Sequence, residues 1–521
     1  MSKRVFRDRR RLLQDEYGTI DKKGNGFCKL RIALAYPNSY HVGMSNLGFQ
    51  LLYRLFNQAE GTLCQRVFLP ENKEYCFNSR RNILTSFESE IPVREFDILA
   101  FSVNYELDYF NVVKMLQMAG LPLLVSERAE GPIIMAGGAC VTMNPEPLAD
   151  FLDLFVLGDG EPACASIINE YLDTPPLSRT ERLARLGSLP GNYRPPAVSS
   201  PSVQLPDRLI CRRPEGVFSQ IVTPNTEFSD IFLLEISRGC KQKCPFCLVG
   251  GIYSPYRPYR FESLEPFLRQ GISLGKKIGL VAANVADHPE IERIMRFILS
   301  AGGSFTISSL KIGQPGIKLL PLLRRAGCRT VSIAPESASQ KLLDRLKKGL
   351  RIPQIYEMAE AVYANSLPNI KLYFLLGIPG ETGEDFQALI RMIHRIDRIR
   401  SGHTKNGKIT VSINPLTPKP HTAFAHIGVP DYKKYHNRIT ALRKEFRQHR
   451  QIRIIAEKSP KGWCQFLLST GDRRLATLFQ LVVQEGYGLK QALTEFNPVI
   501  NLADICQTPE NESGQRPYKI C

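Results

Sequence analysis

Three closely spaced cysteines follow an apolar run in the sequence Ile231-Phe-Leu-Leu-Glu235-Ile-Ser-Arg-Gly-Cys240-Lys-Gln-Lys-Cys244-Pro-Phe-Cys247. The run has the length of a buried strand, which places the cysteines in the loop at the end of that strand. Cysteine thiolates are the usual ligands of iron–sulfur clusters, and three thiolates can bind three irons of a cubane. The sequence therefore predicts a 4Fe–4S cluster whose fourth iron keeps an open coordination position.

A structural zinc site is the other chemistry that these cysteines suggest. A zinc knuckle normally closes with a fourth Cys or His at short spacing. Neither residue type occurs between Leu248 and Asp287. Lys241 and Lys243 would also offset the negative charge of a cluster and favour thiolates. Spacing and context favour a cluster with Cys240, Cys244 and Cys247 as its metal ligands.

Five further apolar runs follow the cysteines, with helical patterns between them. Strands that alternate with helices predict a parallel sheet with helical crossovers. Six strands are enough for a partial (β/α) barrel and too few for an eight-unit one. We place this core at residues 226–428. Its later strands are expected at Ile278–Ala282, Phe305–Ser308, Thr330–Ala334, Ile370–Leu376 and Ile409–Ile413.

The first part of the chain predicts a second α/β domain, at residues 29–188. Apolar runs again alternate with helical patterns, which favours a Rossmann-like parallel sheet. Prolines and serines then concentrate beyond residue 188, and we interpret residues 189–225 as a linker. The four runs of this domain are Leu30–Ala35, Phe96–Ser102, Pro132–Ala136 and Leu154–Leu157.

The C-x3-C-x2-C motif at the end of a first barrel strand resembles the radical S-adenosylmethionine (SAM) superfamily. The resemblance implies that SAM chelates the open iron and that the reduced cluster cleaves it to a 5′-deoxyadenosyl radical. Ala334-Pro-Glu336-Ser resembles the ribose-contacting segment, with Glu336 as the hydroxyl acceptor. Gly377-Ile-Pro379-Gly380-Glu381-Thr resembles the segment that packs near the adenine. Segments in this order over about 200 residues are a specific signal.

Two other segments bear on this resemblance. Asn414-Pro-Leu-Thr-Pro-Lys-Pro-His421-Thr resembles a subgroup shared by cobalamin-domain enzymes and methylthiotransferases. The loop after the second barrel strand departs from the family pattern, because it has Asn284-Val-Ala-Asp287-His where Gly-Gly-Glu is usual. We expect Asn284 to lie at the cofactor, with backbone contacts to the methionine amino group still possible.

The first domain resembles the cobalamin-binding-type domain found ahead of many radical SAM cores. Its glycine turns would lie at the carboxyl edge of the sheet, where open α/β folds bind ligands. Cobalt-ligating domains of this type use Asp-x-His-x-x-Gly, and His41 lacks both the Asp and the Gly. A hydrogen-bonded loop histidine is therefore favoured over a cobalt ligand, and cobalamin binding without a histidine stays open. The cofactor-binding glycines expected here are Gly137, Gly138, Gly158 and Gly160.

Composition and charge exclude several classes of protein. The 521 residues carry 13 mostly scattered cysteines, which is not a secreted disulfide framework. We find no signal peptide and no apolar run long enough to span a bilayer, so we expect a cytoplasmic protein with no transmembrane segment. The net charge of +18 favours anionic partners. Part of that charge lies in residues 1–28, interpreted as a basic, solvated leader.

The C-terminal extension, residues 429–521, is expected to be mainly helical and basic. Ten Lys or Arg residues lie between Lys433 and Lys461, against Glu445 and Glu457. Such a helix could meet RNA or an anionic lipid surface. A solvated helix face is the simpler interpretation, and the segment shows no aromatic interleaving typical of single-strand binding.

Three functions remain open from the sequence. The first is a radical SAM enzyme in which bound cobalamin gives a methyl group to an unactivated carbon, since cofactors carry such chemistry. The second omits cobalamin and performs cyclisation, oxidation or sulfur insertion. The third is an RNA-binding protein with a structural cluster. The resemblance implies an electron donor such as flavodoxin or ferredoxin and a small-molecule, lipid or peptide substrate; nucleic acid is not favoured.

Overall fold

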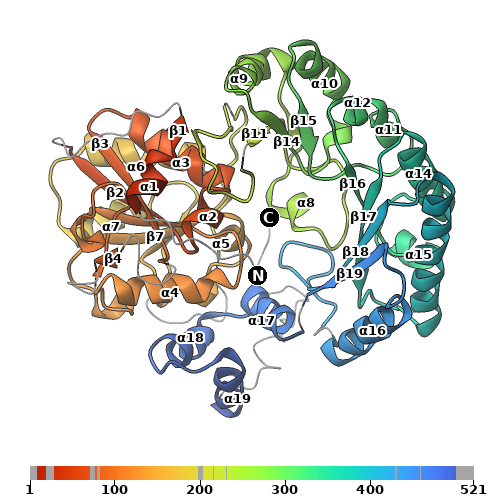
Figure 1. Cartoon of the computed structure of the whole chain (residues 1–521). Helices are drawn as coiled ribbons and strands as arrows, with labels where there is room; N and C mark the ends of the chain where they lie inside the picture. The colour runs from red at the N-terminus through yellow and green to blue at the C-terminus, as the bar shows by residue number, and fades with distance from the viewer. Residues whose placement is uncertain are drawn as a thin grey trace. The chain divides into compact units, whose positions relative to one another are not determined.

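A computed structural model describes residues 9–18, 28–70, 77–78, 83–196, 204–214, 216–229, 231–428, 431–457 and 459–499 (Figure 1). Contacts within the chain group these residues into two compact units. Unit 1 takes the described residues of Met1–Asp230 and Leu467–Cys521, and unit 2 takes those of Ile231–Phe466. No helix in the described parts of the chain is both long and apolar enough to cross a membrane.

Unit 1 is built on a six-stranded sheet that is parallel except at one edge. Its order is β3-β2-β6-β7-β8-β9, and only β9 pairs antiparallel, with β8. The chain turns from one side of β2 to the other when it enters β6, so a topological switch point lies between these strands. The strands are β2 (Leu30–Tyr36), β3 (Thr62–Phe68), β6 (Ile98–Ser102), β7 (Ile133–Gly137), β8 (Leu154–Val156) and β9 (Asn192–Tyr193).

Helices cover both faces of this sheet, as the sequence predicted for a Rossmann-like domain. Helices α3 (Leu47–Gln58) and α6 (Gly160–Leu172) pack on one face, and α4 (Asp108–Met118) lies on the other (Figure 1). The side chain of Asn46 accepts a hydrogen bond from Phe49 N and so caps the start of α3. The unit also contains α2 (Tyr40–Gly43), α5 (Ala139–Met143) and α7 (Arg179–Gly187).

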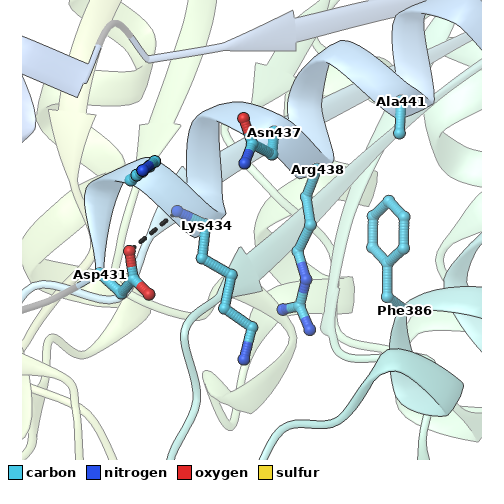
Figure 2. Close-up of a pocket in the computed structure, with 7 residues that line it drawn as sticks. Phe386, Asp431, Lys434, Asn437, Arg438 and Ala441 are labelled. Atoms are coloured by element: carbon cyan, nitrogen blue, oxygen red, sulfur yellow. Dashed lines mark hydrogen bonds between the residues drawn. The ribbon is translucent and has the colours of Figure 1, made fainter.

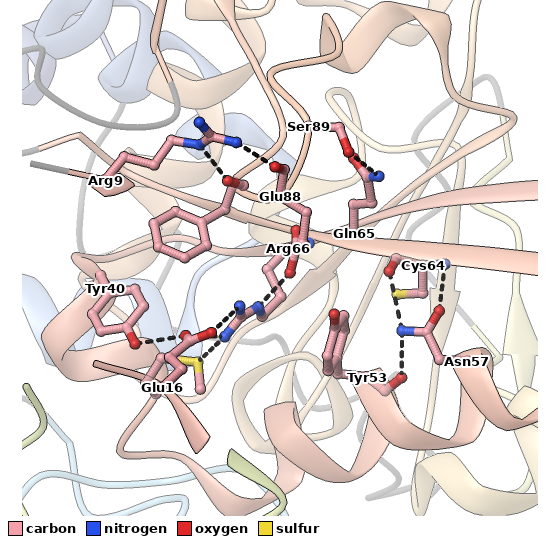
Figure 3. Close-up of polar contacts among 12 residues, drawn as sticks. Arg9, Glu16, Tyr40, Tyr53, Asn57, Cys64, Gln65, Arg66, Glu88 and Ser89 are labelled. Carbon is pink, nitrogen blue, oxygen red and sulfur yellow. Dashed lines mark hydrogen bonds and ion pairs between the residues drawn. The ribbon is translucent and has the colours of Figure 1, made fainter. Parts of the chain in front are cut away.

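The interpretation of the leader as a solvated arm is wrong for residues 9–18. They form α1 (Arg9–Gln14) and β1 (Tyr17–Gly18), which pairs with β10 (Ile221–Val222). Glu16 lies 2.6 Å from the fully buried Arg66, which also pairs with Glu88 at 2.6 Å (Figure 3). A buried guanidinium needs such partners, and this need draws the segment into unit 1. The rest of the leader, residues 1–8 and 19–27, lies outside the described residues.

Unit 2 contains the six expected barrel strands in sequence order, all parallel. Strands β11, β14 and β15 form one sheet, and β16, β17 and β18 lie in a second. Leu310 N donates to Ser332 O at 2.8 Å where the two sheets meet. Helices wrap the outer side of the strands (Figure 1). The strands are β11 (Ile231–Glu235), β14 (Lys277–Val281), β15 (Phe305–Ile307), β16 (Thr330–Glu336), β17 (Asn369–Leu376) and β18 (Lys408–Pro415).

A seventh strand, β19 (Ile452–Ala456), extends the second sheet beside β18. It lies in the region expected to be mainly helical, where α16 (Tyr432–Glu445), α17 (Ser459–Thr470), α18 (Ala476–Val483) and α19 (Leu489–Val499) form the rest. Only Ile452 of its short Ile-Arg-Ile-Ile-Ala run is buried, which is why the sequence signal was weak. The crossover helices of unit 2 include α9 (Phe261–Ser273), α10 (Ile291–Ser300), α14 (Ile352–Ala364) and α15 (Gly383–His403).

The chain beyond Leu467 packs into unit 1 through polar and aromatic contacts. Asn144 Nδ2 donates to the carbonyl oxygens of Ser469 and Gly471 at 3.0 and 2.7 Å. Arg473 pairs with the buried Glu146 at 3.2 Å. The C-terminal extension is thus divided between the two units, and the expected linker supplies β9 and β10. The domain boundaries drawn from the sequence stay predictions.

Candidate functional site: a cysteine loop at the carboxyl ends of the barrel strands

The cysteine loop lies where the sequence placed it, directly after β11. Strand β12 (Ser237–Arg238) pairs with β13 (Arg257–Pro258), so the cysteine loop and α8 (Leu248–Ile252) both lie between two paired strands. Gly239 has φ +77°, and a side chain there would collide with the backbone of Tyr253. Only glycine accepts both constraints readily. The turn therefore fixes the position of the first cysteine.

The three cysteines are free thiols, each partly buried. Burial raises the pKa of Cys240, and the neighbouring Cys247 raises it further. Burial also raises the pKa of Cys244, while Lys348 lowers it and the other two cysteines raise it. The three thiols are therefore neighbours within the loop. The donor set of three close thiols is the one that an iron–sulfur cluster requires, so the residues fit that group.

A single metal ion fits this loop less well than a cluster. Across the described residues, no three Cys, His, Asp or Glu side chains converge closely enough to hold one ion. Zinc needs four ligands in a tight tetrahedron. A cubane binds each thiolate through a different iron, so its ligands stand farther apart. The preference for a cluster over zinc therefore stays a prediction from the sequence.

Two lysine–carboxylate pairs flank the thiols. Lys348 Nζ lies 3.6 Å from Glu336 Oε1 beside Cys244. Lys311 Nζ lies 2.7 Å from Asp287 Oδ1, and both groups influence Cys240. Burial raises the pKa of Glu336, which Lys348 opposes. Each pair presents one cation and one anion beside the cysteine loop.

The carboxylates of both pairs lie at or just after the ends of barrel strands. Glu336 ends β16 with φ +68°, after an irregularity in the pairing with β17. A positive φ in a non-glycine residue is strained and is often found at functional sites. Asn284 donates from Nδ2 to Asp287 Oδ2 at 2.7 Å, so it holds the carboxylate that Lys311 contacts. Asn284 and Glu336 were both expected at the cofactor. Glu336 lies near Cys244, and Asn284 holds Asp287, which lies near Cys240.

The loop after β17 is shaped by Glu381. Its Oε2 accepts a hydrogen bond from Gly377 N at 2.6 Å and lies 2.7 Å from Arg438 Nη1. Arg438 Nη2 donates to Thr382 O at 3.0 Å, which ties α16 to the same loop. The side chain of Glu381 is only 5% exposed. The Glu381 side chain therefore holds the loop in shape, whereas the sequence led us to expect a direct contact between Glu381 and the cofactor.

The other residues of this loop, Pro379 and Gly380, are held through their carbonyls. Pro379 O accepts from Arg345 Nη1 at 2.6 Å, and Gly380 O accepts from Lys341 Nζ at 3.2 Å. Gly377 and Gly380 both have positive φ, so the tight turn requires glycine at these positions. The loop is consequently fixed from both sides before any ligand arrives.

An apolar cluster joins this loop to the cysteine loop. Ile378 and Leu416 are buried together with two leucines of the helix region after β16, and Phe246 packs against them. Phe246 lies between Cys244 and Cys247 in sequence. The segment after β18 also contacts the cysteine loop, since Phe424 N donates to Pro245 O at 2.9 Å. Three strand ends therefore share one apolar surface beside the thiols.

Two adjoining cavities open beside the loop after β17. The first, of about 260 Å³, is lined by Ile378, Leu416 and neighbouring loop residues and by Lys434 and Arg438 of α16. The second, of about 390 Å³, is lined by Phe386 and a basic side of α16 (Figure 2). Figure 2 shows Lys434 and Arg438 extending from the helix toward the same side. Both cavities share Asp431, Lys434 and Arg438.

The glycine turns of unit 1 pack against the chain's own backbone. Gly138 has φ +110° and a side chain there would collide with the backbone of Val103. Gly158 has φ +101°, faces the backbone of Leu209 and forms a bridge with it. Gly137 and Gly160 lie beside Val156 and Leu52. The structure places all four at the carboxyl edge, and gives them a packing role there.

His41 is held by two neighbours within unit 1. Its Nδ1 lies 3.1 Å from Asn225 O, and its Nε2 lies 3.6 Å from Glu227 Oε1. The hydrogen-bonded loop histidine preferred from the sequence is what the structure shows.

The switch point of unit 1 carries a set of polar side chains. Asn38 Nδ2 donates to Asp108 Oδ1 at 2.9 Å, and Asn104 Nδ2 donates to Ser102 Oγ at 3.1 Å. Burial raises the pKa of Asp108 to about 6, which hydrogen bonds from Asn38 and Asn111 partly oppose. Asn38 and Asn104 remain partly exposed. Amides at this edge suit a ligand that carries amide or hydroxyl groups.

Two family models match the chain. The family described as "Radical SAM proteins, N-terminal" matches residues 48–195, and "Radical SAM superfamily" matches residues 234–393, which include the cysteine loop. The chain belongs to the radical SAM superfamily. This radical SAM protein is an enzyme, and its family implies a 4Fe–4S cluster and SAM as cofactors. The RNA-binding protein with a structural cluster, the third function considered, is set aside.

Relatives of this radical SAM enzyme include proteins of known and unknown activity. It is 27% identical over 452 residues to an uncharacterized protein of Methanocaldococcus jannaschii, covering 85% of this chain and 89% of that protein. It is 25% identical over 204 residues to the ribosomal protein uS12 methylthiotransferase RimO of Geobacter sulfurreducens. That match covers 36% of this chain and 45% of the methylthiotransferase, less than half of it.

Solved structures share the fold of this radical SAM enzyme at low identity. The methyltransferase TsrM from Kitasatospora setae, with cobalamin and a 4Fe–4S cluster bound, has a TM-score of 0.54 and 13% identity, over 78% of this chain and 75% of that one. The cobalamin-dependent enzyme OxsB, with aqua-cobalamin and SAM bound, has a TM-score of 0.51 and 12% identity. The match covers 90% of this chain and 70% of the OxsB chain.

The sequence missed several residues that this site uses. Arg438 lies 57 positions beyond Glu381, and no local pattern links them. Lys311 follows the third barrel strand, where a charged residue at a strand end was a usable signal. Phe246 stood inside the cysteine motif, but only the packing against Ile378 reveals its role.

Proposed function

We propose that this enzyme uses a cluster on Cys240, Cys244 and Cys247 to cleave SAM reductively and to break a substrate C–H bond, with methyl transfer from bound cobalamin to the resulting carbon. The observation that supports the first part is the neighbourhood of three thiols, two lysine–carboxylate pairs and one apolar surface at the carboxyl ends of the barrel strands. When bound, the cluster supplies the electron that breaks the sulfonium bond.

Asp287 and Lys311 are assigned to the methionine end of SAM. That end carries an ammonium and a carboxylate, so it needs one anion and one cation side by side. The Asp287–Lys311 pair provides both at 2.7 Å, with Asp287 9% and Lys311 30% exposed. Asn284 fixes Asp287 from the other side. The pair replaces the acidic group of the usual Gly-Gly-Glu loop, which this chain lacks.

Glu336 and the apolar surface are assigned to the adenosine end. A carboxylate accepts hydrogen bonds from two ribose hydroxyls, and Lys348, 3.6 Å from Glu336, opposes the rise in the pKa of Glu336 that burial causes. Ile378, Leu416 and Phe246 offer an apolar face for the flat adenine ring. The ring edge can hydrogen-bond to the loop backbone that Glu381 and Arg438 hold in place. Each part of SAM thus meets a group of matching chemistry.

Cobalamin, when bound, would supply the methyl group. The switch point of unit 1 supports this proposal, because the partly exposed Asn38 and Asn104 can hydrogen-bond to the amide side chains of a corrin. The shared fold with cobalamin-bound TsrM is a second support. We do not assign His41 as a cobalt ligand, because its ring already contacts Asn225 O and lies near Glu227.

A second candidate omits cobalamin and keeps the radical step. The glycine turns favour it, because the backbone of Val103 and of Leu209 already occupies the space beside Gly138 and Gly158. In this case unit 1 would dock the substrate, and the reaction would be a cyclisation, an oxidation or a sulfur insertion. The protein purified after growth with added cobalamin separates the two candidates by its cobalt content.

The radical step is tested with anaerobically reconstituted protein, dithionite and SAM. The expected product is 5′-deoxyadenosine, measured by liquid chromatography, with none from the Cys244→Ala variant. Cys211→Ala is the matched control, because Cys211 lies in unit 1 and is expected to leave the product unchanged. A wild-type protein that carries iron and sulfide but forms no product would overturn the proposal.

A further inference from the structure

Helix α16 and the turn after it present a strongly basic surface. Six cations are exposed there, against Asp431 and Glu445. We call this set the basic face of α16. Because the charges lie on one side of a single helix and the following turn, their fields add. The set consists of Lys433, Lys434, Arg443, Lys444, Arg447 and Arg450.

The apolar and aromatic residues of the same helix are turned inward. Tyr435 and Ile439 are 5% and 4% exposed, and Leu442 is fully buried. Proteins that bind single-stranded nucleic acid stack bases on exposed aromatic rings, and membrane-surface helices insert an apolar face. The described part of α16 offers neither. Its exposed side acts through charge, which suits an acidic protein surface.

The basic face lies close to the cysteine loop of the same unit. Lys434 and Arg438 line the 260 Å³ cavity together with Ile378 and Leu416. The last two residues pack against Phe246, which stands between two of the cysteines. Ile378 and Leu416 therefore connect the start of the basic face to the cysteine loop. A partner on α16 would therefore approach the cluster more closely than one on the amino ends of the strands.

We propose that the basic face of α16 docks a small acidic one-electron carrier, a flavoprotein or an iron–sulfur protein, that reduces the cluster. The inference rests on the proposed function, since only a cluster that cleaves SAM needs a repeated supply of electrons. In each transfer the reduced carrier loses one electron and the oxidised cluster gains it, with no bond formed or broken. The charge complementarity raises the association rate and orients the carrier toward α16.

The test compares reduction of the reconstituted enzyme by reduced flavodoxin and by dithionite, followed in a stopped-flow instrument by the absorbance of the cluster. The variant K433E/K444E/R447E reverses three charges outside the cavity shared with Ile378. At low salt we expect its second-order rate constant with flavodoxin to fall about tenfold or more, with a shallower salt dependence. Its reduction by dithionite should stay within twofold of wild type.

The variant R324E/R325E/R329E is the matched control, with the same charge change on exposed arginines before β16, at the amino ends of the strands. It should keep the flavodoxin rate within about twofold. An equal fall in both variants, or no fall in either, would overturn the proposal. So would an RNA complex that is lost in K433E/K444E/R447E while flavodoxin reduction is unchanged. Failure of the proposed function looks different, since dithionite would then give no 5′-deoxyadenosine either.

Discussion

Arg438 Nη1 lies 2.7 Å from Glu381 Oε2, and this ion pair connects helix α16 to the loop after β17. Glu381 in turn accepts the N–H of Gly377, so the helix sets the shape of the loop assigned to the adenine. Both side chains are at most 10% exposed. A pair so buried is costly to break, because the remaining charge loses its partner without gaining water.

Replacing Arg438 should therefore weaken SAM binding without removing the cluster. In Arg438→Gln, Glu381 loses its charged partner and the loop loses its tie to α16. We expect the dissociation constant of SAM to rise about tenfold, or ~1.4 kcal/mol, measured by equilibrium dialysis on reconstituted protein. Arg443→Gln, on the exposed side of the same helix, should bind SAM as wild type does. Equal affinity in Arg438→Gln would contradict the role of the pair.

Asp287 and Lys311 should matter for SAM and not for adenosine alone. Lys311→Ala removes the cation for the methionine carboxylate, and a hydrogen bond to a charged group contributes about 1.5–3 kcal/mol. We expect SAM to bind at least tenfold more weakly, while the affinity for 5′-deoxyadenosine stays unchanged. Lys318→Ala, an exposed lysine seven residues away, serves as the control. A parallel loss of affinity for both ligands would show a general disruption instead.

The fold of this enzyme was largely predictable from local patterns, while its site was predictable only in part. The run Leu30–Tyr36 is almost wholly buried and Asn369–Leu376 is buried at every second residue, so each gave a clear strand. The cysteines were found because ligands of one cluster lie within eight positions. Arg438 and Glu381 are far apart in sequence and meet only through the packing of α16. No single-sequence pattern encodes such a contact.

The leader in unit 1 likewise depends on a contact between residues that are far apart in sequence. Its basic composition suggested a solvated arm, yet Glu16 is fully buried against Arg66. The decisive residue was Glu16, one of two adjacent acids after a run of arginines, and its partner lies 50 positions away in β3. A buried arginine in a strand could have been a signal that an acidic partner must exist somewhere.

Removing Glu16 should destabilise the protein markedly. Glu16→Ala leaves Arg66 with Glu88 alone and leaves the Tyr40 hydroxyl without its acceptor. Breaking a buried pair costs about 3–5 kcal/mol, which scanning calorimetry should show as a lower unfolding temperature of one transition. Glu90→Ala removes an exposed carboxylate 3.5 Å from Arg9 and should shift that transition little. Equal, small shifts for both variants would contradict the buried triad.

Asp108 should make stability depend on pH. Its folded pKa of about 6 exceeds the ordinary value of 3.8, so the folded state binds the proton more tightly than the unfolded state. Its contribution is therefore present at low pH and is lost as pH rises from about 4 to about 6, by up to about 3 kcal/mol. Asp108→Asn should reduce this loss, measured by urea unfolding at pH 4.5 and 7. An unchanged difference between the two pH values would argue against the shift.

The central claim is that three thiolates hold a cubane with one iron open to SAM. Electron paramagnetic resonance of the anaerobically reconstituted, dithionite-reduced protein tests it most directly. We predict a 4Fe–4S signal that changes shape when SAM is added and that is absent from Cys244→Ala. A protein that binds only zinc at the loop, or a cluster signal that SAM leaves unaltered, would contradict the account.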